Sequence, residues 1–391
     1  MKKIIYLLII ALLSQCNMGT GRQEAGELIE FDCSVKYPEK EVYIQDIADV
    51  EYIPLETNSN TLLSSRTRII HVSDNYIVAV TSSTGDVFVF DGKGRSKFSF
   101  NHTGKSGTEY TRLSSAAFDE NNREIFIFDR YASIPKIQVY AEDGEYKRAL
   151  ECPPDFVPQI YNFDDAALLA YDEYGLSIQE NYSNKPYLLL SKKDGGIVDT
   201  LDINLPVRIS TSHFFEIEID GQTYTTSVGV PMPLNISYGK DFIISDLSSD
   251  TIYKLTPQKK LTPVIVRTPP VQNTDPKIVV TNSLITDRFI ILRKAILDFE
   301  SIKTTREVSL ADIMYDFETK QFNVIKLINK DFESLGIEFQ QAITHENIGV
   351  DLIDISTLFE EDEKGKVHGK LKQIISTLDE EDNPVLVKMK F

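Results

Sequence analysis

The 391-residue chain has no tryptophan and contains only three cysteines and five histidines. So few cysteines exclude a fold that is held together by many disulfides. The histidines show no metal-ligand spacing such as His-x-x-x-His, and no Gly-x-Ser-x-Gly motif of a serine hydrolase occurs. The sequence therefore predicts no catalytic residue, no metal site and no cofactor, and the missing tryptophan makes a lectin-like sugar platform less favoured.

Basic residues are scarce relative to acidic ones. Lys and Arg number 41 against 59 Asp and Glu, for a net charge of −18. Proteins bind nucleic acid mainly by neutralising phosphates with basic residues, and no Lys/Arg stripe occurs here. We therefore expect no nucleic-acid partner.

A hydrophobic run long enough to cross a membrane as a helix is also missing. The one apolar stretch, Ile4–Leu13, is ten residues long and follows Lys2-Lys3. A basic start, a short apolar run and a cleavage zone are typical of a secretory signal, so we interpret residues 1–15 as a signal peptide.

Leu13-Ser14-Gln15-Cys16 resembles a bacterial lipobox, although Gln15 stands where a small residue is usual. The resemblance implies that Cys16 is acylated and holds the protein to the outer membrane, with residues 16–40 as a lipidated N-terminus and leash. The alternative is an ordinary signal peptide with a cysteine nearby. Because Asn17–Gly21 lacks an acidic export signal, a periplasm-facing protein is slightly favoured over a surface-exposed one.

One phrase returns at least five times between Asp74 and Glu318: a β-rich run, a polar break, a second β-rich run and a tight turn. The clearest copy joins Glu124–Asp129 and Ile137–Tyr140 to the hairpin signal Asp143-Gly144. The spacing of roughly 40 to 55 residues is the size of a four-stranded propeller blade. The sequence thus predicts an all-β, six-bladed propeller of four-stranded antiparallel blades over residues 41–391. The predicted blades are 61–104, 105–152, 153–205, 206–260, 261–330 and 331–391.

A ring of blades needs its first and last strands to meet, because an open sheet edge invites aggregation. Val50–Leu55 and Pro384–Phe391 are the candidates to share a blade. Val367–Leu378 breaks the β pattern with apolar residues at helical spacing, so it predicts a short helical insertion in the last blade. Its apolar stripe would pack on the flank of the propeller; a mobile cap over the pore is the alternative.

Three phrases carry a family resemblance: Asp46–Thr57, Gly104–Tyr110 and Asp382–Leu386. They resemble the six-bladed β-propeller lipoproteins of Bacteroides-type bacteria, with NHL- and TolB-like repeats, and the resemblance covers residues 41–391. It implies a six-bladed ring on an outer-membrane lipid anchor. The family has no uniform chemistry, so the resemblance implies no particular substrate.

The glycine-containing loop of that resemblance directs attention to Glu109, Tyr110 and Arg112 as ligand-binding candidates. They precede Leu113–Phe118, which we interpret as an innermost strand, and would lie near the mouth of the central channel. The alternative is that Glu109 and Tyr110 only brace a junction between blades.

Asp199-Thr200-Leu201 and Asp250-Thr251-Ile252 resemble acceptor motifs for O-glycosylation in secreted proteins of the same bacteria. This makes Thr200 and Thr251 candidate modification sites. Whether Cys33 and Cys152 pair in an oxidising compartment stays open.

These features favour a lipid-anchored, non-enzymatic binding module of the cell envelope for a protein or glycan-related ligand, with the membrane contacted through the lipid only. Two alternatives remain: a hydrolase or lyase that depends on a hard cation at the channel mouth, and a structural scaffold of the envelope.

Overall fold

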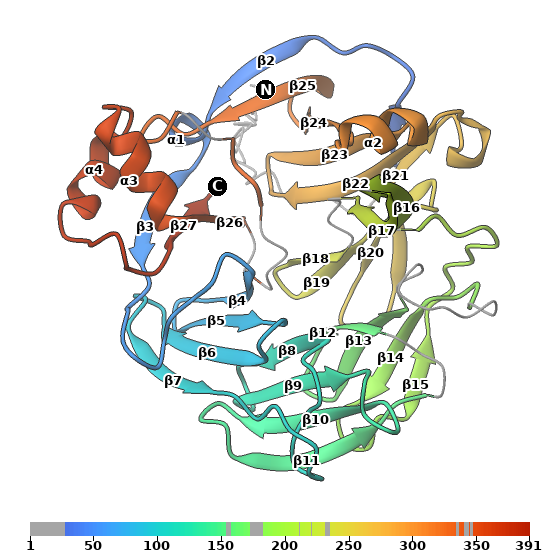
Figure 1. The fold of residues 1–391 in the computed structure, drawn as a ribbon. Helices are drawn as coiled ribbons and strands as arrows, with labels where there is room; N and C mark the ends of the chain where they lie inside the picture. The colour runs from blue at the N-terminus through green and yellow to red at the C-terminus, as the bar shows by residue number, and fades with distance from the viewer. Residues whose placement is uncertain are drawn as a thin grey trace, which may run out of the picture.

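A computed structural model describes residues 28–153, 158–172, 183–210, 212–219, 221–230, 235–333, 336–339, 344 and 347–391. Six of its sheets stand around a central axis as the blades of a propeller (Figure 1). The predicted six-bladed fold is therefore confirmed. Cys16 and the predicted signal peptide, residues 1–15, lie outside the described residues.

Blades I, II and III are four-stranded, antiparallel and continuous in sequence. Their second strands are buried along their whole length, because each is covered on both faces by neighbouring blades. Blade I comprises β4 (Thr67–Val72), β5 (Tyr76–Thr81), β6 (Asp86–Asp91) and β7 (Ser96–Phe100). Blade II comprises β8 (Ser115–Asp119), β9 (Glu124–Asp129), β10 (Lys136–Ala141) and β11 (Tyr146–Glu151). Blade III comprises β12 (Pro158–Asn162), β13 (Ala167–Asp172), β14 (Tyr187–Ser191) and β15 (Ile197–Thr200).

Blades IV and V each gain a fifth, parallel strand from the N-terminal segment. In blade IV, β1 (Ile29–Asp32) pairs with β21, and in blade V, β2 (Glu39–Tyr43) pairs with β25. Blade IV comprises β18 (Asn235–Tyr238), β19 (Asp241–Ile244), β20 (Thr251–Leu255) and β21 (Leu261–Thr268). Blade V comprises β22 (Lys277–Ile285), β23 (Phe289–Leu297), β24 (Ser309–Asp316) and β25 (Gln321–Ile328).

These additions correct two expectations. The blades are not uniformly four-stranded and antiparallel, and the expected leash up to residue 40 is wrong for Ile29–Asp32, which is part of blade IV. The predicted boundary at residue 261 is also wrong, because β21 belongs to blade IV. A separate hairpin of β16 (Ser212–Ile219) and β17 (Gln222–Gly229) occupies the start of the segment that was predicted as the fourth blade.

Blade VI closes the ring with strands from both ends of the chain. Strand β27 (Val385–Lys390) lies between β26 (Ile348–Ile353) and β3 (Asp49–Pro54), and pairs antiparallel with both. The predicted meeting of the two chain ends in one blade is therefore confirmed. A short helix, α1 (Ile44–Ile47), leads from β2 into β3.

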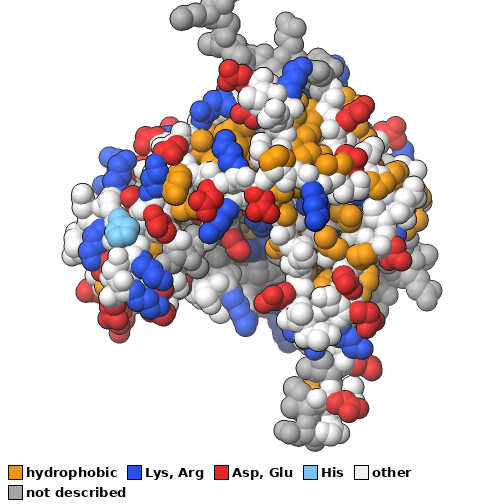
Figure 2. Space-filling model, turned by 90° about the horizontal axis from the view of Figure 1, so that it is seen from above, with side chains coloured by type: hydrophobic (Ala, Val, Ile, Leu, Met, Phe, Trp, Pro, Cys, Tyr) orange, Lys and Arg blue, Asp and Glu red, His pale blue; other side chains and the backbone are white. Residues whose placement is uncertain are grey.

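The insertion in blade VI consists of two helices, α3 (Ile355–Glu363) and α4 (Gly369–Ile375), of which only the second was predicted. Leu371 and Ile375 are buried in one cluster with Val385 of β27, so the apolar stripe packs against blade VI on the outside of the ring, as predicted (Figure 1). The outer surface of the insertion, on the left of Figure 2, is dense in acidic and basic side chains. Two further short helices are α2 (Phe299–Thr305) and the 3-10 turn Val271–Asn273.

Within the described residues, no helix is both long enough and apolar enough to span a bilayer. Cys33 follows β1 in blade IV and Cys152 follows β11 in blade II, and both are free thiols. The pairing that the sequence left open is not formed.

Removal of strand β27 should abolish cooperative folding, because its central position leaves both β26 and β3 without a partner. We expect deletion of residues 384–391 to remove the unfolding transition in a thermal melt. Leu386, fully buried in β27, supplies a milder variant: Leu386→Ala should lower the free energy of unfolding by about 2–5 kcal/mol in a denaturant titration. The exposed Lys390→Ala in the same strand should change it by less than about 0.5 kcal/mol. Equal stability of the truncated and full-length chains would contradict this role.

Candidate functional site

The loop that was predicted to bind a ligand is a brace between blades I and II. Tyr110 is fully buried, its hydroxyl donates to the Gly85 carbonyl at 2.6 Å, and the same oxygen accepts from the His102 backbone at 3.0 Å. Its ring meets Tyr140 of β10 edge to face. Burial raises the pKa of Tyr110 to about 12. These contacts give Tyr110 a structural role at the junction between the two blades.

Glu109 and Arg112 are more accessible than Tyr110 but do not converge with it. The Glu109 carboxylate accepts from the Ser106 backbone N–H at 2.8 Å, and this bond lowers its pKa. The exposed Arg112 guanidinium lies 5.3 Å from the ring of Tyr131. A ligand-binding role for these three residues therefore stays a prediction. Their contacts favour a structural role instead.

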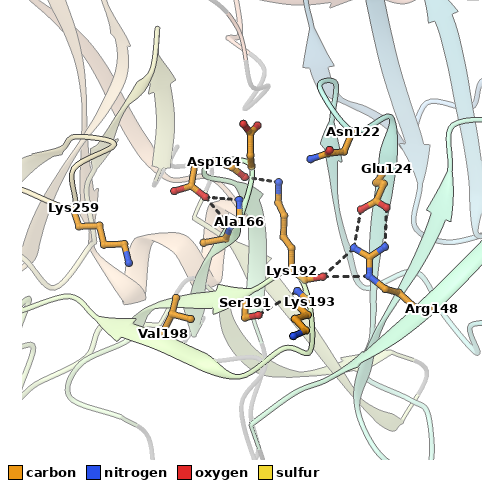
Figure 3. Close-up of a pocket in the computed structure, with 12 residues that line it drawn as sticks. Asn122, Glu124, Arg148, Asp164, Ala166, Ser191, Lys192, Lys193, Val198 and Lys259 are labelled. Atoms are coloured by element: carbon orange, nitrogen blue, oxygen red, sulfur yellow. Dashed lines mark hydrogen bonds and ion pairs between the residues drawn. The ribbon is translucent and has the colours of Figure 1, made fainter.

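A pocket of about 490 Å³ opens at the other end of the blades (Figure 3). Its walls include the loops after the first strands of blades II and III and the loops between the third and fourth strands of blades III and IV. Because successive strands are antiparallel, these loops lie at the end opposite to the blade-to-blade connection that holds Glu109. The lining residues are Asn122, Glu124, Arg148, Asp164, Asp165, Ala166, Ala167, Ser191, Lys192, Lys193, Val198 and Lys259.

Lys192 forms the floor of this pocket with a buried charge. Its side chain is 5% exposed and its ammonium group donates to the Asp119 carboxylate, to the Asn162 amide oxygen at 2.6 Å and to the Asp164 carbonyl. The three donors of the ammonium are thereby satisfied, which a buried charge requires. Lys192 and Asp119 tie blade III to blade II and hold the pocket's shape.

Arg148 and Glu124 form the wall on the side of blade II. The Arg148 guanidinium donates two hydrogen bonds, of 2.7 and 2.8 Å, to the Glu124 carboxylate and a further one to the Lys192 carbonyl at 2.9 Å. The Arg148 bond is the main cause that lowers the pKa of Glu124, and the same bond raises the pKa of Arg148. Such bidentate pairs are geometrically specific, so this wall is rigid before any ligand arrives.

Backbone geometry also holds two loops of this pocket in place, the one after β12 and the one between β14 and β15. Asp164 accepts from the N–H groups of Ala166 and Ala167 at 2.8 and 2.7 Å. Gly195, in the turn between β14 and β15, has φ +84°, and a Cβ there would collide with the Glu151 carbonyl of blade II. Only glycine permits this close approach of blades II and III.

Lys193 and Lys259 project into the same pocket from blades III and IV (Figure 3). Across the described part of the chain, neither ammonium group has a hydrogen bond or an ion pair. The cations of the floor and of the blade II wall are already matched by carboxylates. The two lysines therefore offer positive charge to an anionic group, while Asp164 and Asp165 add to the same lining two carboxylates that pair with no cation among the described residues.

The other predicted residues lie elsewhere. Thr200 is exposed at the end of β15, whereas Thr251 is half-buried at the start of β20, so exposure favours Thr200 as the modification site. Over the described ranges, no three His, Cys, Asp or Glu side chains converge in a metal-binding group. Sequence reasoning missed Lys192 and Lys193. Their one signal was a lysine pair directly before the Asp194-Gly195 turn in an acidic chain.

The fold and pocket define a six-bladed propeller with a polar site between blades. The chain belongs to the family of a domain of unknown function, DUF4934, whose model matches residues 27–390. No curated protein matches it.

Solved structures with the same fold include a Bacteroides fragilis protein that is described as exported. It is 16% identical, with a TM-score of 0.63, over 93% of this chain and 99% of that chain. A DUF4221 member from Bacteroides vulgatus is 8% identical, with a TM-score of 0.46, over 88% and 97%. A streptogramin B lyase is 10% identical, with a TM-score of 0.35, over 88% and 98%.

The neighbouring lysines Lys192 and Lys193 should differ sharply in their effect on stability. Lys192→Met leaves the buried Asp119 carboxylate unpaired, so we expect the free energy of unfolding to fall by about 3–5 kcal/mol. Lys193→Met removes an exposed charge and should change it by less than about 0.5 kcal/mol. Urea titration of both variants checks this, and similar losses in the two would refute the assigned role of Lys192.

Proposed function

We propose that this protein is a non-enzymatic, lipid-anchored propeller of the cell envelope, which binds a carboxylate-bearing segment of a partner protein in the pocket across blades II, III and IV. The observation that carries the proposal is that Lys193 and Lys259 have no ion pair among the described residues, whereas Arg148 and Lys192 in the same pocket are matched by Glu124 and Asp119. A pocket with a prearranged wall loses little entropy when a ligand binds.

The lining favours a protein segment over a neutral glycan. None of the lining residues is aromatic, whereas sugar rings are commonly held against aromatic faces. Ammonium groups instead attract carboxylates, and the bonds they form are charge-assisted. An acidic glycan remains the other ligand that this chemistry admits.

The net charge of −18 does not exclude an acidic partner. At physiological ionic strength, charges separated by more than about 8 Å are largely screened, so the lysines at the site dominate close approach. Binding should for the same reason weaken as salt is raised.

The envelope location is supported by the signal sequence, by the lipobox-like Leu13–Cys16 and by the described export of the similar Bacteroides fragilis protein. We therefore propose that the protein is an outer-membrane lipoprotein that faces the periplasm.

Removal of the two free lysines should weaken partner binding without unfolding the protein. We expect Lys193→Ala/Lys259→Ala to bind a glutamate-rich peptide at least ~10-fold more weakly than wild type in calorimetry, because each charge-assisted bond contributes about 1.5–3 kcal/mol. Lys326→Ala/Lys390→Ala, which removes two exposed lysines outside the pocket, is the matched control.

Two other outcomes of this experiment would point to a different function. Binding of oligogalacturonate but not of the peptide would identify an acidic glycan as the ligand. Equal binding by wild type and the pocket variant would remove this site from the function and favour the scaffold.

The anchor is tested separately. Cys16→Ser should move the protein from the membrane fraction to the soluble fraction, because acyl chains would then be missing. Fractionation followed by immunoblotting checks this. Full retention of the variant in membranes would rule out Cys16 as the anchor.

A further inference from the structure

A second cavity, of about 510 Å³, lies between blades V and VI. Its polar lining comprises Arg293, Asp312, Asn329, Glu338 and Asp351, and the remainder is mainly apolar. It involves none of the residues of the pocket in Figure 3. Its size falls within the range of about 300–1,000 Å³ that is usual for small-molecule sites.

Rows of directly paired residues on blades V and VI include Arg293, Asp312, Asp351 and Val387 of this lining. On blade V, Thr281 lies opposite Arg293, and Arg293 opposite Asp312. On blade VI, Asp351 lies opposite Val387, and Val387 opposite Tyr52. Directly paired residues share one face of a sheet, so each row forms one wall.

The charges of the cavity are unequal. The Arg293 guanidinium is matched by the Asp312 carboxylate through two bonds of 2.8 and 3.1 Å. Asp351 accepts only from backbone N–H groups, those of Leu352 at 2.8 Å and Glu338 at 3.1 Å. In the described part of the chain, no cation pairs with the carboxylate of Glu338 or Asp351. The lining therefore carries one cation, Arg293, against three carboxylates, those of Asp312, Glu338 and Asp351.

A buried hydroxyl on the same wall is also without a partner. Thr281 is fully buried, and its Oγ1 makes no hydrogen bond with any described residue. A buried polar atom without a partner costs free energy, so a ligand or water that reaches it is favoured. Thr281 lies on the same face of blade V as Arg293, which lines the cavity, but it is not itself one of the lining residues.

We propose that the cavity between blades V and VI is a second binding site, which takes a small organic ligand with a primary ammonium group on an apolar stem. The ammonium group supplies a positive charge beside Asp351 and Glu338, and the stem packs against Phe332, Ile337 and Leu352. An organic cation fits better than a metal ion, because no three acidic, histidine or cysteine side chains converge among the described residues.

The site responds to pH through Asp351. Burial, reinforced by the nearby Glu338 carboxylate, raises the pKa of Asp351 to about 7. Titratable groups near the cavity include Arg293 on β23, Asp312 on β24, Tyr52 on β3 and Asp331 near Tyr52. Because an ammonium ion prefers the ionised carboxylate, affinity rises as pH rises through this pKa, and binding below it releases a proton.

n-Pentylamine is a suitable probe, with uncharged 1-pentanol as its control. Calorimetry on the full-length protein should show roughly tenfold tighter binding of the amine at about pH 8 than at about pH 6, and weaker binding of the alcohol at both. Asp351→Asn should remove the pH dependence. Glu338→Gln should weaken binding at both pH values, whereas the exposed Glu318→Gln should leave it unchanged.

Thermal melts establish that each variant is folded, and Glu338→Gln and the wild-type pH comparison stand even where Asp351→Asn does not fold. Absence of amine binding by wild type, equal affinity for amine and alcohol, or tight binding of Ca²⁺ in place of the amine would each overturn the proposal. Unchanged amine binding by folded Asp351→Asn at both pH values would do the same. None of these results bears on the lysine pocket, which is tested by its own variants.

Discussion

The pairing of β27 with β3 is the constraint on which the rest of the structure depends. Each blade packs only on its neighbours, so the spacing between blades holds only while the ring is closed. Both candidate sites lie between blades, and their walls belong to different sheets. The N-terminal segment reinforces the closure, because β1, β2 and β3 join blades IV, V and VI in turn. One stretch of about 25 residues thereby connects half of the ring.

The parts of the fold that depend on local sequence pattern could be predicted from the sequence. Fully buried second strands such as Glu124–Asp129 read as continuous β-rich runs, the Asp-Gly pairs read as hairpins, and Leu371 and Ile375 read as a helical stripe. The parallel additions of β1 and β2 were not predictable in this way. Ile29–Asp32 is only four residues long, and its pairing with Ile265–Thr268 depends on the completed ring. The boundary at residue 261 was wrong because β21 still belongs to blade IV, and the turn signals that separate it from blade V, Pro269-Pro270 and Asp275-Pro276, come after it.

The candidate site was less predictable than the fold, for two physical reasons. Lys192 reads as an ordinary surface lysine before a turn, and its burial follows from Asp119, which is 73 residues away in sequence. Tyr110 shows the converse case, in which an aromatic residue in a glycine-containing loop suggests a ligand platform. Its hydroxyl instead satisfies the backbone of Gly85 and His102 between two blades. Residue type indicates which bonds a side chain can form. Its burial and its partners within the fold decide whether a donor, an acceptor or a charge remains available to a ligand.

The same N-terminal strands limit where an anchored ring can lie. If Cys16 carries the lipid, 12 residues lie between it and the start of β1, and an extended chain over those 13 steps reaches at most about 45 Å. Strand β1 belongs to blade IV, which also supplies Lys259 to the lysine pocket. With that anchor, the pocket would be tethered through the blade that helps to form it, rather than through a distant part of the ring. A partner that reaches it must lie close to the membrane, which favours another envelope protein over a freely diffusing one.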